Sequence, residues 1–119
     1  MVAALEKALA VILATPEVAA LGDDTVWPLY ADEGVEGLYI TYRVDELATI
    51  TKNAIAQDRL TVGVFDDDYL KIAEMADAIK AQVLKNDAGT NFFFEGSTSD
   101  FSNDLQTAFV SMSFTFKHK

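Results

Sequence analysis

The clearest pattern in the chain is a change of hydrophobic period between residues 59 and 84. The first part alternates, which predicts a strand whose inward side holds Leu60, Val62 and Val64. In the second part, apolar residues recur at spacings of three and four, which predicts a helix with an apolar side of Ile72, Ala73, Ala76, Ile79 and Val83. Three carboxylates, Asp66–Asp68, stand at the change and can cap the first helical turn. The join therefore predicts a helix that packs back onto a sheet.

Two helices are predicted at the N-terminus. The first covers 2–14, with an apolar side of Leu5, Leu9, Ile12 and Leu13. Thr15 and Pro16 give the signal for a new helix, with Thr15 as N-cap, and Gly22 suits a left-handed end. The apolar run of the first helix is short and has no basic segment before it, so we expect neither a signal peptide nor a membrane span.

Further strands are predicted from β-branched and aromatic residues that alternate with polar ones. Pro28 places the first of these strands at a sheet edge. The strand at 91–95 is followed by a polar, turn-rich segment at 96–103. The predicted strands, besides the one at 59–65, lie at 25–30, 38–44, 91–95 and 105–117.

The segment 45–58 permits two interpretations. Its composition allows a helix, but Thr49, Ile50 and Thr51 are β-branched and Lys52-Asn53 suits a turn. We favour two strands that are prolonged into a projecting hairpin with its tip near Asn53.

These elements predict a single α+β domain over 1–119 in the order α-α-β-β-β-α-β-β. Successive strands joined by hairpins give a mainly antiparallel sheet of four or five strands. The aliphatic sides of 38–44, 60–64 and 108–116 need a cover, and the helices at 2–14 and 68–85 are the candidates. Both are therefore expected on one face of the sheet.

The chain is strongly acidic, with a net charge of −10 and a pI of about 4.3. It lacks the clustered Lys and Arg that phosphate binding requires, so direct nucleic-acid binding is not expected. The acidic residues concentrate in 23–37 and 86–104, each without a base. These stretches are either solvated loops or an acidic surface turned toward one compartment, such as a pore lumen that DNA must pass without sticking.

The chain offers little for catalysis or for holding a cofactor. It has no cysteine, and His118 is its only histidine, near a terminus that we expect to fray. The serines have no nucleophile-elbow motif, and Asp66–Asp68 lack the alternating ligands of a calcium loop. We therefore predict no catalytic residue, no metal and no cofactor.

Several apolar side chains have no evident core position. Trp27 and Tyr30 lie on the predicted edge strand, and Phe93 points away from Phe92 and Phe94. Leu47, Ile50 and Ile55 lie on the predicted hairpin, where exposure in a monomer would favour aggregation. These six residues are the candidates for self-assembly contacts. An alternative is a ligand-binding or enzyme domain with an aromatic pocket lined by Phe92, Phe94, Phe114 and Phe116.

The order of elements resembles the small tail-completion, or tail-terminator, proteins of long-tailed bacteriophages and prophages. The resemblance rests on an Ala- and Leu-rich helical pair followed by four segments: VWPLY at 26–30, LYITYR at 38–43, RLTVGVFDDDYLKIAEMADAI at 59–79 and FVSMSFTF at 109–116. One departure is Gly37, where the family pattern leads us to expect a proline before the second strand.

The resemblance implies a structural protein without enzymatic activity. Such proteins form rings, commonly hexameric, at the end of the tail tube, where they stop its polymerisation and join it to the head. The implied partners are tail-tube and head-connector proteins, and the implied locations are the virion and, during assembly, the host cytoplasm. The hairpin at 45–58 and the strand edges would make the ring contacts. An adaptor role in a cellular multiprotein complex is a further alternative.

Overall fold

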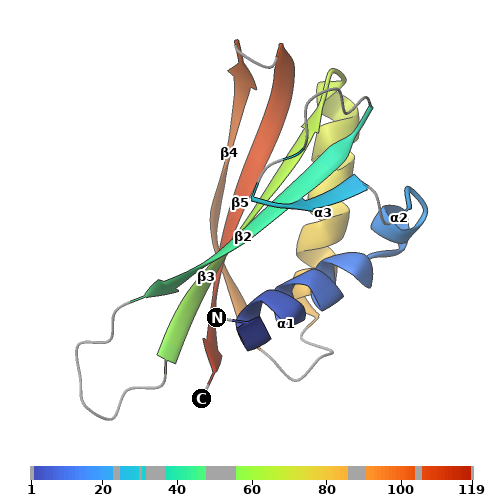
Figure 1. Cartoon of the computed structure of the whole chain (residues 1–119). Coiled ribbons are helices and arrows are strands. Elements are labelled where there is room, and N and C mark those ends of the chain that lie inside the picture. Colours follow the sequence, from blue (N-terminus) through green and yellow to red (C-terminus); the bar gives the residue numbers. More distant parts are fainter. Residues whose placement is uncertain are drawn as a thin grey trace.

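The computed structural model describes residues 2–22, 25–29, 31, 37–47, 56–85, 91–103 and 106–118. The predicted α+β class and the order α-α-β-β-β-α-β-β are confirmed (Figure 1). The elements are α1 (Val2–Leu13), α2 (Pro16–Ala19), β1 (Val26–Pro28), β2 (Tyr39–Leu47), β3 (Ala56–Asp66), α3 (Tyr69–Leu84), β4 (Phe92–Ser102) and β5 (Thr107–His118).

The five strands form one sheet in the order β1-β2-β3-β5-β4. The pairs β2–β3, β3–β5 and β5–β4 are antiparallel, as predicted. The edge strand β1 instead runs parallel to β2, with Val26 opposite Ile40 and Pro28 opposite Tyr42, so the sheet is mixed. The expectation that successive strands are joined by hairpins fails for β1 and β2. Two parallel strands cannot be joined by a tight turn, because the chain must first run back to the end of the sheet at which the first strand began. The edge position of Pro28 is confirmed.

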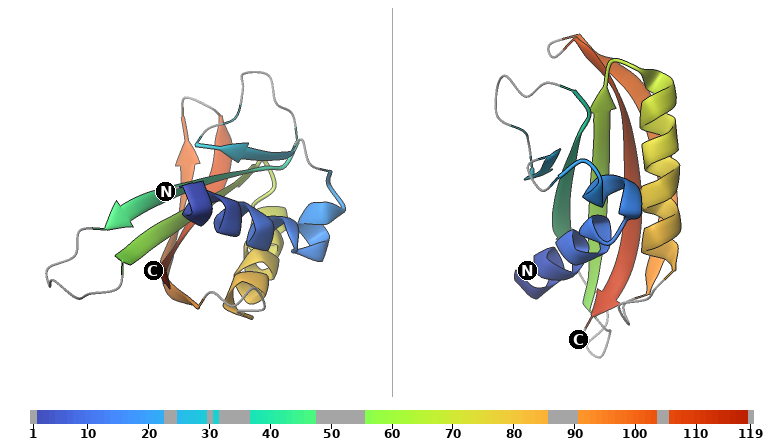
Figure 2. Two further views of the ribbon diagram at one scale, coloured as in Figure 1. Left: turned by 60° about the horizontal axis from the view of Figure 1, so that its bottom comes forward. Right: turned by 90° about the vertical axis from the view of Figure 1, so that its right-hand side faces the viewer.

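Both main helices cover the same face of the sheet, as the one-sided alternation predicted. Helix α1 packs on β2 and α3, while α3 packs on β3, β4 and β5. In the right-hand view of Figure 2 the helices stand in front of the strands. Burial alternates along the strands, and the inward side chains of the three inner strands are Ile40, Tyr42, Val44, Leu60, Val62, Val64, Val110, Met112, Phe114 and Phe116. Asp58 lies on this covered side as well, as a buried carboxylate near one end of β3.

The N-terminal helices bury smaller side chains than the sequence suggested. The buried side of α1 consists of Ala4, Ala8, Val11 and Ile12, while Leu5, Leu9 and Leu13 are only partly buried around it. Small residues let α1 approach closely. At the next helix Pro16 occupies the first turn as predicted, but the Thr15 side chain makes no capping hydrogen bond. Gly22 has φ +98°, which agrees with the predicted left-handed end.

The join between β3 and α3 follows the prediction closely. β3 ends at Asp66 and α3 begins at Tyr69. The Asp68 carboxylate accepts hydrogen bonds from the backbone N–H groups of Leu70 (3.0 Å) and Lys71 (3.4 Å), which are free donors at the start of a helix. Of the three aspartates, Asp68 is therefore the one that caps the helix.

Strand β4 is longer than the sequence predicted. The expected strand 91–95 and polar turn 96–103 form a single strand, Phe92–Ser102. Its register against β5 shifts between Phe94 and Gly96. The prediction was wrong because it gave weight to the turn-forming types Gly96, Asp100 and the serines, which can still lie in a strand when a neighbouring strand pairs with them. Here the whole segment finds hydrogen-bond partners along β5, down to Ser102 opposite Thr107.

Replacement of Met112 by Asp should unfold the protein or destabilise it by several kcal/mol. Met112 is 2% exposed, in the middle of the helix-covered face, so the new carboxylate would be buried without a partner. Urea unfolding followed by circular dichroism measures the change. Ser113→Asp, one residue along on the uncovered face, is the matched control and should unfold near the wild-type midpoint.

Replacement of Asp68 by Ala should lower the free energy of unfolding by about 0.5–2 kcal/mol, the usual cost of a lost N-cap. Asp67→Ala is the control, because it removes a neighbouring carboxylate of equal charge that is not the cap. Thermal unfolding of both variants distinguishes capping from charge: equal destabilisation of the two would contradict the assignment.

Candidate functional site

None of the described helices lies on the second face of the sheet, which carries the most distinctive surface chemistry. At one end, three rings form a row across β2, β3 and β5. Tyr39 stacks on Phe65 (centroids 4.8 Å apart, planes within 6°), and Phe65 lies beside Phe109 (5.4 Å). Partial burial in this row raises the pKa of the Tyr39 hydroxyl above 10.0, because the phenolate would lose hydration.

Gly63 allows the Phe65 ring to fold back over β3. A Cβ atom at Gly63 would lie 2.8 Å from Oγ1 of Thr41 and 2.9 Å from Cε1 of Phe65. Both distances are shorter than real Cβ contacts, so any larger residue must displace one of these side chains. The glycine therefore has a packing role in the strand, which explains its place in an otherwise β-branched run.

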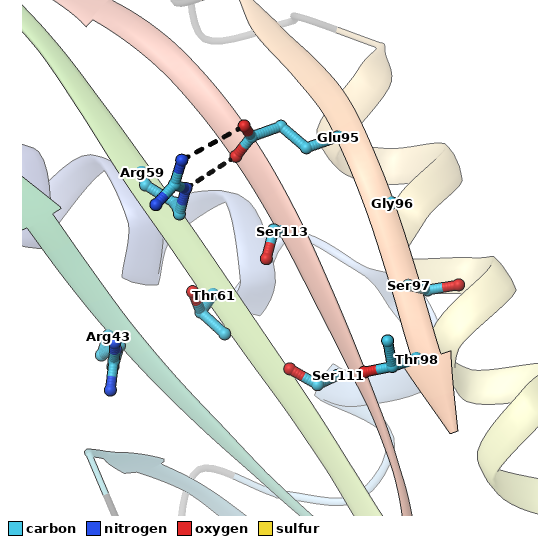
Figure 3. A pocket seen from close by; sticks show the side chains of 9 residues that line it. All are labelled: Arg43, Arg59, Thr61, Glu95, Gly96, Ser97, Thr98, Ser111 and Ser113. Atoms are coloured by element: carbon cyan, nitrogen blue, oxygen red, sulfur yellow. Dashed lines mark hydrogen bonds and ion pairs between the residues drawn. The ribbon is translucent and has the colours of Figure 1, made fainter. Parts of the chain in front are cut away.

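Beside the aromatic row lies a polar hollow of about 500 Å³. Figure 3 shows its side chains projecting from β2, β3, β5 and β4. The lining consists of two arginines, one glutamate, small hydroxyl residues and a glycine: Arg43, Arg59, Thr61, Glu95, Gly96, Ser97, Thr98, Ser111 and Ser113. The pleat brings these residues together, because alternate positions of neighbouring strands share a face.

The charged groups of the hollow are paired. Arg59 donates to both carboxylate oxygens of Glu95, with Nε–Oε1 at 2.8 Å and the second contact at 3.4 Å. The hydrogen bond to Glu95 and its negative charge raise the pKa of Arg59. Arg43 donates through Nε to Asp45 at 3.1 Å. The hollow gathers the only two arginines of the chain in a net acidic molecule.

This arrangement provides hydrogen-bond donors for a polar or acidic group but no evident acid–base machinery. The one carboxylate of the lining is engaged by Arg59, and the lining contains no histidine. His118 lies outside the hollow, as the last residue of β5 opposite Ala56. Within the described part of the chain, no group of three or more His, Asp or Glu residues could hold a metal ion.

The predicted assembly residues have different environments. Phe93 is 56% exposed at the start of β4, on the uncovered face. Trp27 is half-buried, and its indole N–H is buried without a hydrogen-bond partner among the described residues. Leu47 is half-buried at the end of β2, opposite Gln57. Tyr30, Ile50 and Ile55 lie outside the described residues.

The alternative of an aromatic pocket is not supported by the packing. Phe92 lies against Phe116 (4.7 Å between centroids), and Phe94 lies against Phe114 (5.5 Å). Three of these rings are buried in the core, and the ammonium of Lys80 stands 4.0 Å over the ring of Phe94. The four rings pack in and against the core between the sheet and the helices.

Only part of the polar hollow could be predicted from the sequence. Alternation placed Arg43 with Tyr39 and Thr41 on one side of β2. The ion pair joins Arg59 to Glu95, residues 36 positions apart, on strands that both pair with β5. A sequence pattern does not reveal which strands become neighbours, so the hollow was missed.

No protein-family model and no curated protein matches this chain. A solved structure has the same fold: a chain of a structure described as the virion of a native gene transfer agent particle. The TM-score is 0.72 at 15% sequence identity, and the match covers 92% of this chain and 90% of that chain. The shared fold thus extends over nearly the full length of both chains. Among the residues described, no helix is long and apolar enough to cross a membrane.

Gly63→Ala should lower the free energy of unfolding by about 1–3 kcal/mol, because the methyl group overpacks against Thr41 and Phe65. A double-mutant cycle with Thr41→Ala, measured by urea unfolding, tests the cause. Removing the Thr41 hydroxyl should recover part of the loss. If the changes in the free energy of unfolding caused by Gly63→Ala and Thr41→Ala simply add in the double variant, a steric clash between these two residues is contradicted.

Proposed function

We propose that this chain is a structural protein of a phage-type virion, a tail-completion protein that closes the end of the tail tube and joins it to the head. The observation that carries the proposal is the fold shared with a chain of a gene transfer agent virion, matched over nine-tenths of both chains. The tail-terminator resemblance rests on separate grounds, the order and character of the sequence segments. The shared fold and the sequence resemblance both point to a phage-type particle. The role at the tail end is inferred from the sequence resemblance alone.

The surface chemistry fits a structural role better than a catalytic one. The uncovered face offers donors, hydroxyls and stacked rings, which suit contacts with other proteins. We therefore infer no enzymatic activity and no cofactor, and contacts with copies of this chain, the tail tube and the head connector. A chain of net charge −10 favours passage of DNA without adhesion, so direct nucleic-acid binding is not part of the proposal.

The β2–β3 hairpin is the proposed arm for ring contacts. Its strands stay paired as far as Leu47 opposite Gln57, and these ends extend past α1 at the lower left of Figure 1. Strand pairing favours the hairpin interpretation of 45–58 over the helix. The proposed contact residues are Leu47, Ile50 and Ile55, with Trp27, Tyr30 and Phe93 as the second candidate surface.

The function is tested by assembly with the tube. The chain should be produced together with a tail-tube protein from the same genome and imaged by negative-stain electron microscopy. We expect a ring on one end of each tube and tubes of restricted length. Tubes that grow equally long with and without the chain, with no density at their ends, would overturn the tail-end role. Flanking genes unrelated to portal, capsid or tail proteins would favour an adaptor of a cellular complex instead.

The arm is tested by replacing Leu47, Ile50 and Ile55 together with Thr. We expect a folded subunit that no longer forms rings, because threonine suits a strand but offers less apolar contact area. Val2→Thr/Leu21→Thr, which alters two exposed apolar residues outside the hairpin, is the control and should still form rings. Circular dichroism checks folding and electron microscopy counts rings. If the triple variant forms normal rings, the arm is not the ring contact, and the second candidate surface of Trp27, Tyr30 and Phe93 should be tested instead.

A further inference from the structure

The two edges of the sheet differ sharply. Strand β1 has three residues and includes Pro28, which has no N–H to donate. Strand β4 has eleven residues, and it contains no proline, lysine or arginine. Its only sheet neighbour is β5, and no strand of the described chain pairs with its outer side (Figure 1). Natural edge strands are usually short, or blocked by Pro, Lys or a bulge. β4 has one irregularity, at Phe94/Gly96, and the seven residues Gly96–Ser102 beyond it have none of these features.

The outer half of β4 combines an open backbone with exposed side chains. Beyond the irregularity at Phe94/Gly96, the residues from Gly96 to Ser102 pair regularly with β5. Phe101 is 50% exposed in this segment. The hydroxyl of Tyr69, from the first turn of α3, donates to Oγ of Ser99 at 2.8 Å, so a second exposed ring stands beside the same strand.

We propose that this segment pairs with the same segment of a second copy, antiparallel and about a two-fold axis at Ser99. Ser99 is the midpoint of Gly96–Ser102, so this register pairs all seven residues of the segment. It places Asp100 opposite Thr98 of the second copy, where a hydroxyl can donate to the carboxylate, instead of opposite a second Asp100. Phe101 then lies opposite Ser97 of the second copy, where the small side chain leaves room for the ring.

The pairing closes on itself. The β4 edges of the two copies pair with each other, and the two sheets join into one sheet with a β1 strand at each edge. Each of these edges is three residues long and carries Pro28, so further strand addition is blocked. The product is a dimer and not a fibre, which answers the aggregation hazard of the open edge.

This inference does not rest on the proposed tail function. By register, Gly96–Ser102 lies at the end of the sheet opposite to Leu47, and β5 separates β4 from β3. The dimer contact and the proposed ring contact therefore use different surfaces and can be tested separately.

The absence of cysteine from the chain makes single cysteines clean probes. In the proposed register the two Ser99 positions face each other at a Cβ separation of about 4.5–5.5 Å, close to disulfide geometry. The two Ser97 positions are four residues out of register, about 13 Å apart. Under mild oxidation Ser99→Cys should form a covalent dimer at least about tenfold faster than Ser97→Cys. Equal rates, or no dimer from either variant, would overturn the pairing.

A second measurement uses two exposed phenylalanines of the same strand. Phe101→Lys places a charge within the paired segment and should weaken the dimer at least about tenfold in sedimentation equilibrium. Phe93→Lys makes the same change outside the segment, at a residue of similar exposure, and should leave the dimer constant unchanged. A wild-type chain that stays monomeric at all concentrations, or equal weakening by both variants, would refute the proposal.

The cross-linking and tube-assembly experiments distinguish the two proposals. If the chain forms rings on tubes but Ser99→Cys does not cross-link, the dimer alone is refuted. If Ser99→Cys cross-links but the tubes carry no ring, the tail function alone is refuted.

Discussion

The structure depends above all on the antiparallel pairing of β3 with β5. The register runs from Ala56 opposite His118 to Asp66 opposite Ala108, so both strands are paired along almost their whole length. Two consequences follow from this single register. It aligns the alternating aliphatic positions of both strands on one side, which creates the surface that α1 and α3 cover. It also offers an outer edge on each side, to which β2 and β4 add.

The same alternation gives the molecule two unlike faces. The covered face holds the core, where Phe114 and Phe116 pack with Phe94 and Phe92 beneath the helices. The uncovered face combines a stacked row of rings with a polar hollow centred on the Arg59–Glu95 pair. None of the described helices covers that face, so these groups lie on the side of the sheet away from the core.

The edges of the sheet add a second level of organisation. One edge is short and closed by Pro28, while the other is long and open along Gly96–Ser102. An asymmetric sheet of this kind can associate through one edge only, which limits the geometry of any strand-mediated contact. The paired ends of β2 and β3, at Leu47 and Gln57, lie at the opposite end of the sheet from the open segment of β4.

The amino-acid sequence by itself determined the local features. Periodicity fixed the strand–helix join at Asp66–Tyr69, and Asp68 is the cap because a carboxylate can reach the free N–H groups of the next turn. Alternation also determined which side chains of β2, β3 and β5 face the core, since a residue's side in a strand depends only on its position parity. From this followed the α+β class, the order of elements and the common face of the helices.

Tertiary structure alone decided the features that depend on a partner strand. The parallel direction of β1, the extension of β4 through Gly96–Ser102 and the meeting of Arg59 with Glu95 all require knowledge of which strands become neighbours. Gly96, Asp100 and the serines of this segment have weak strand preferences of their own, and pairing with β5 makes their segment a strand. The periodicity of the sequence determines the structure of a segment of a few residues. Which strands become neighbours depends instead on how the whole apolar face of the sheet is buried. Hence the sequence predicted the elements and their sides, and the folded sheet decided its edges and its polar hollow.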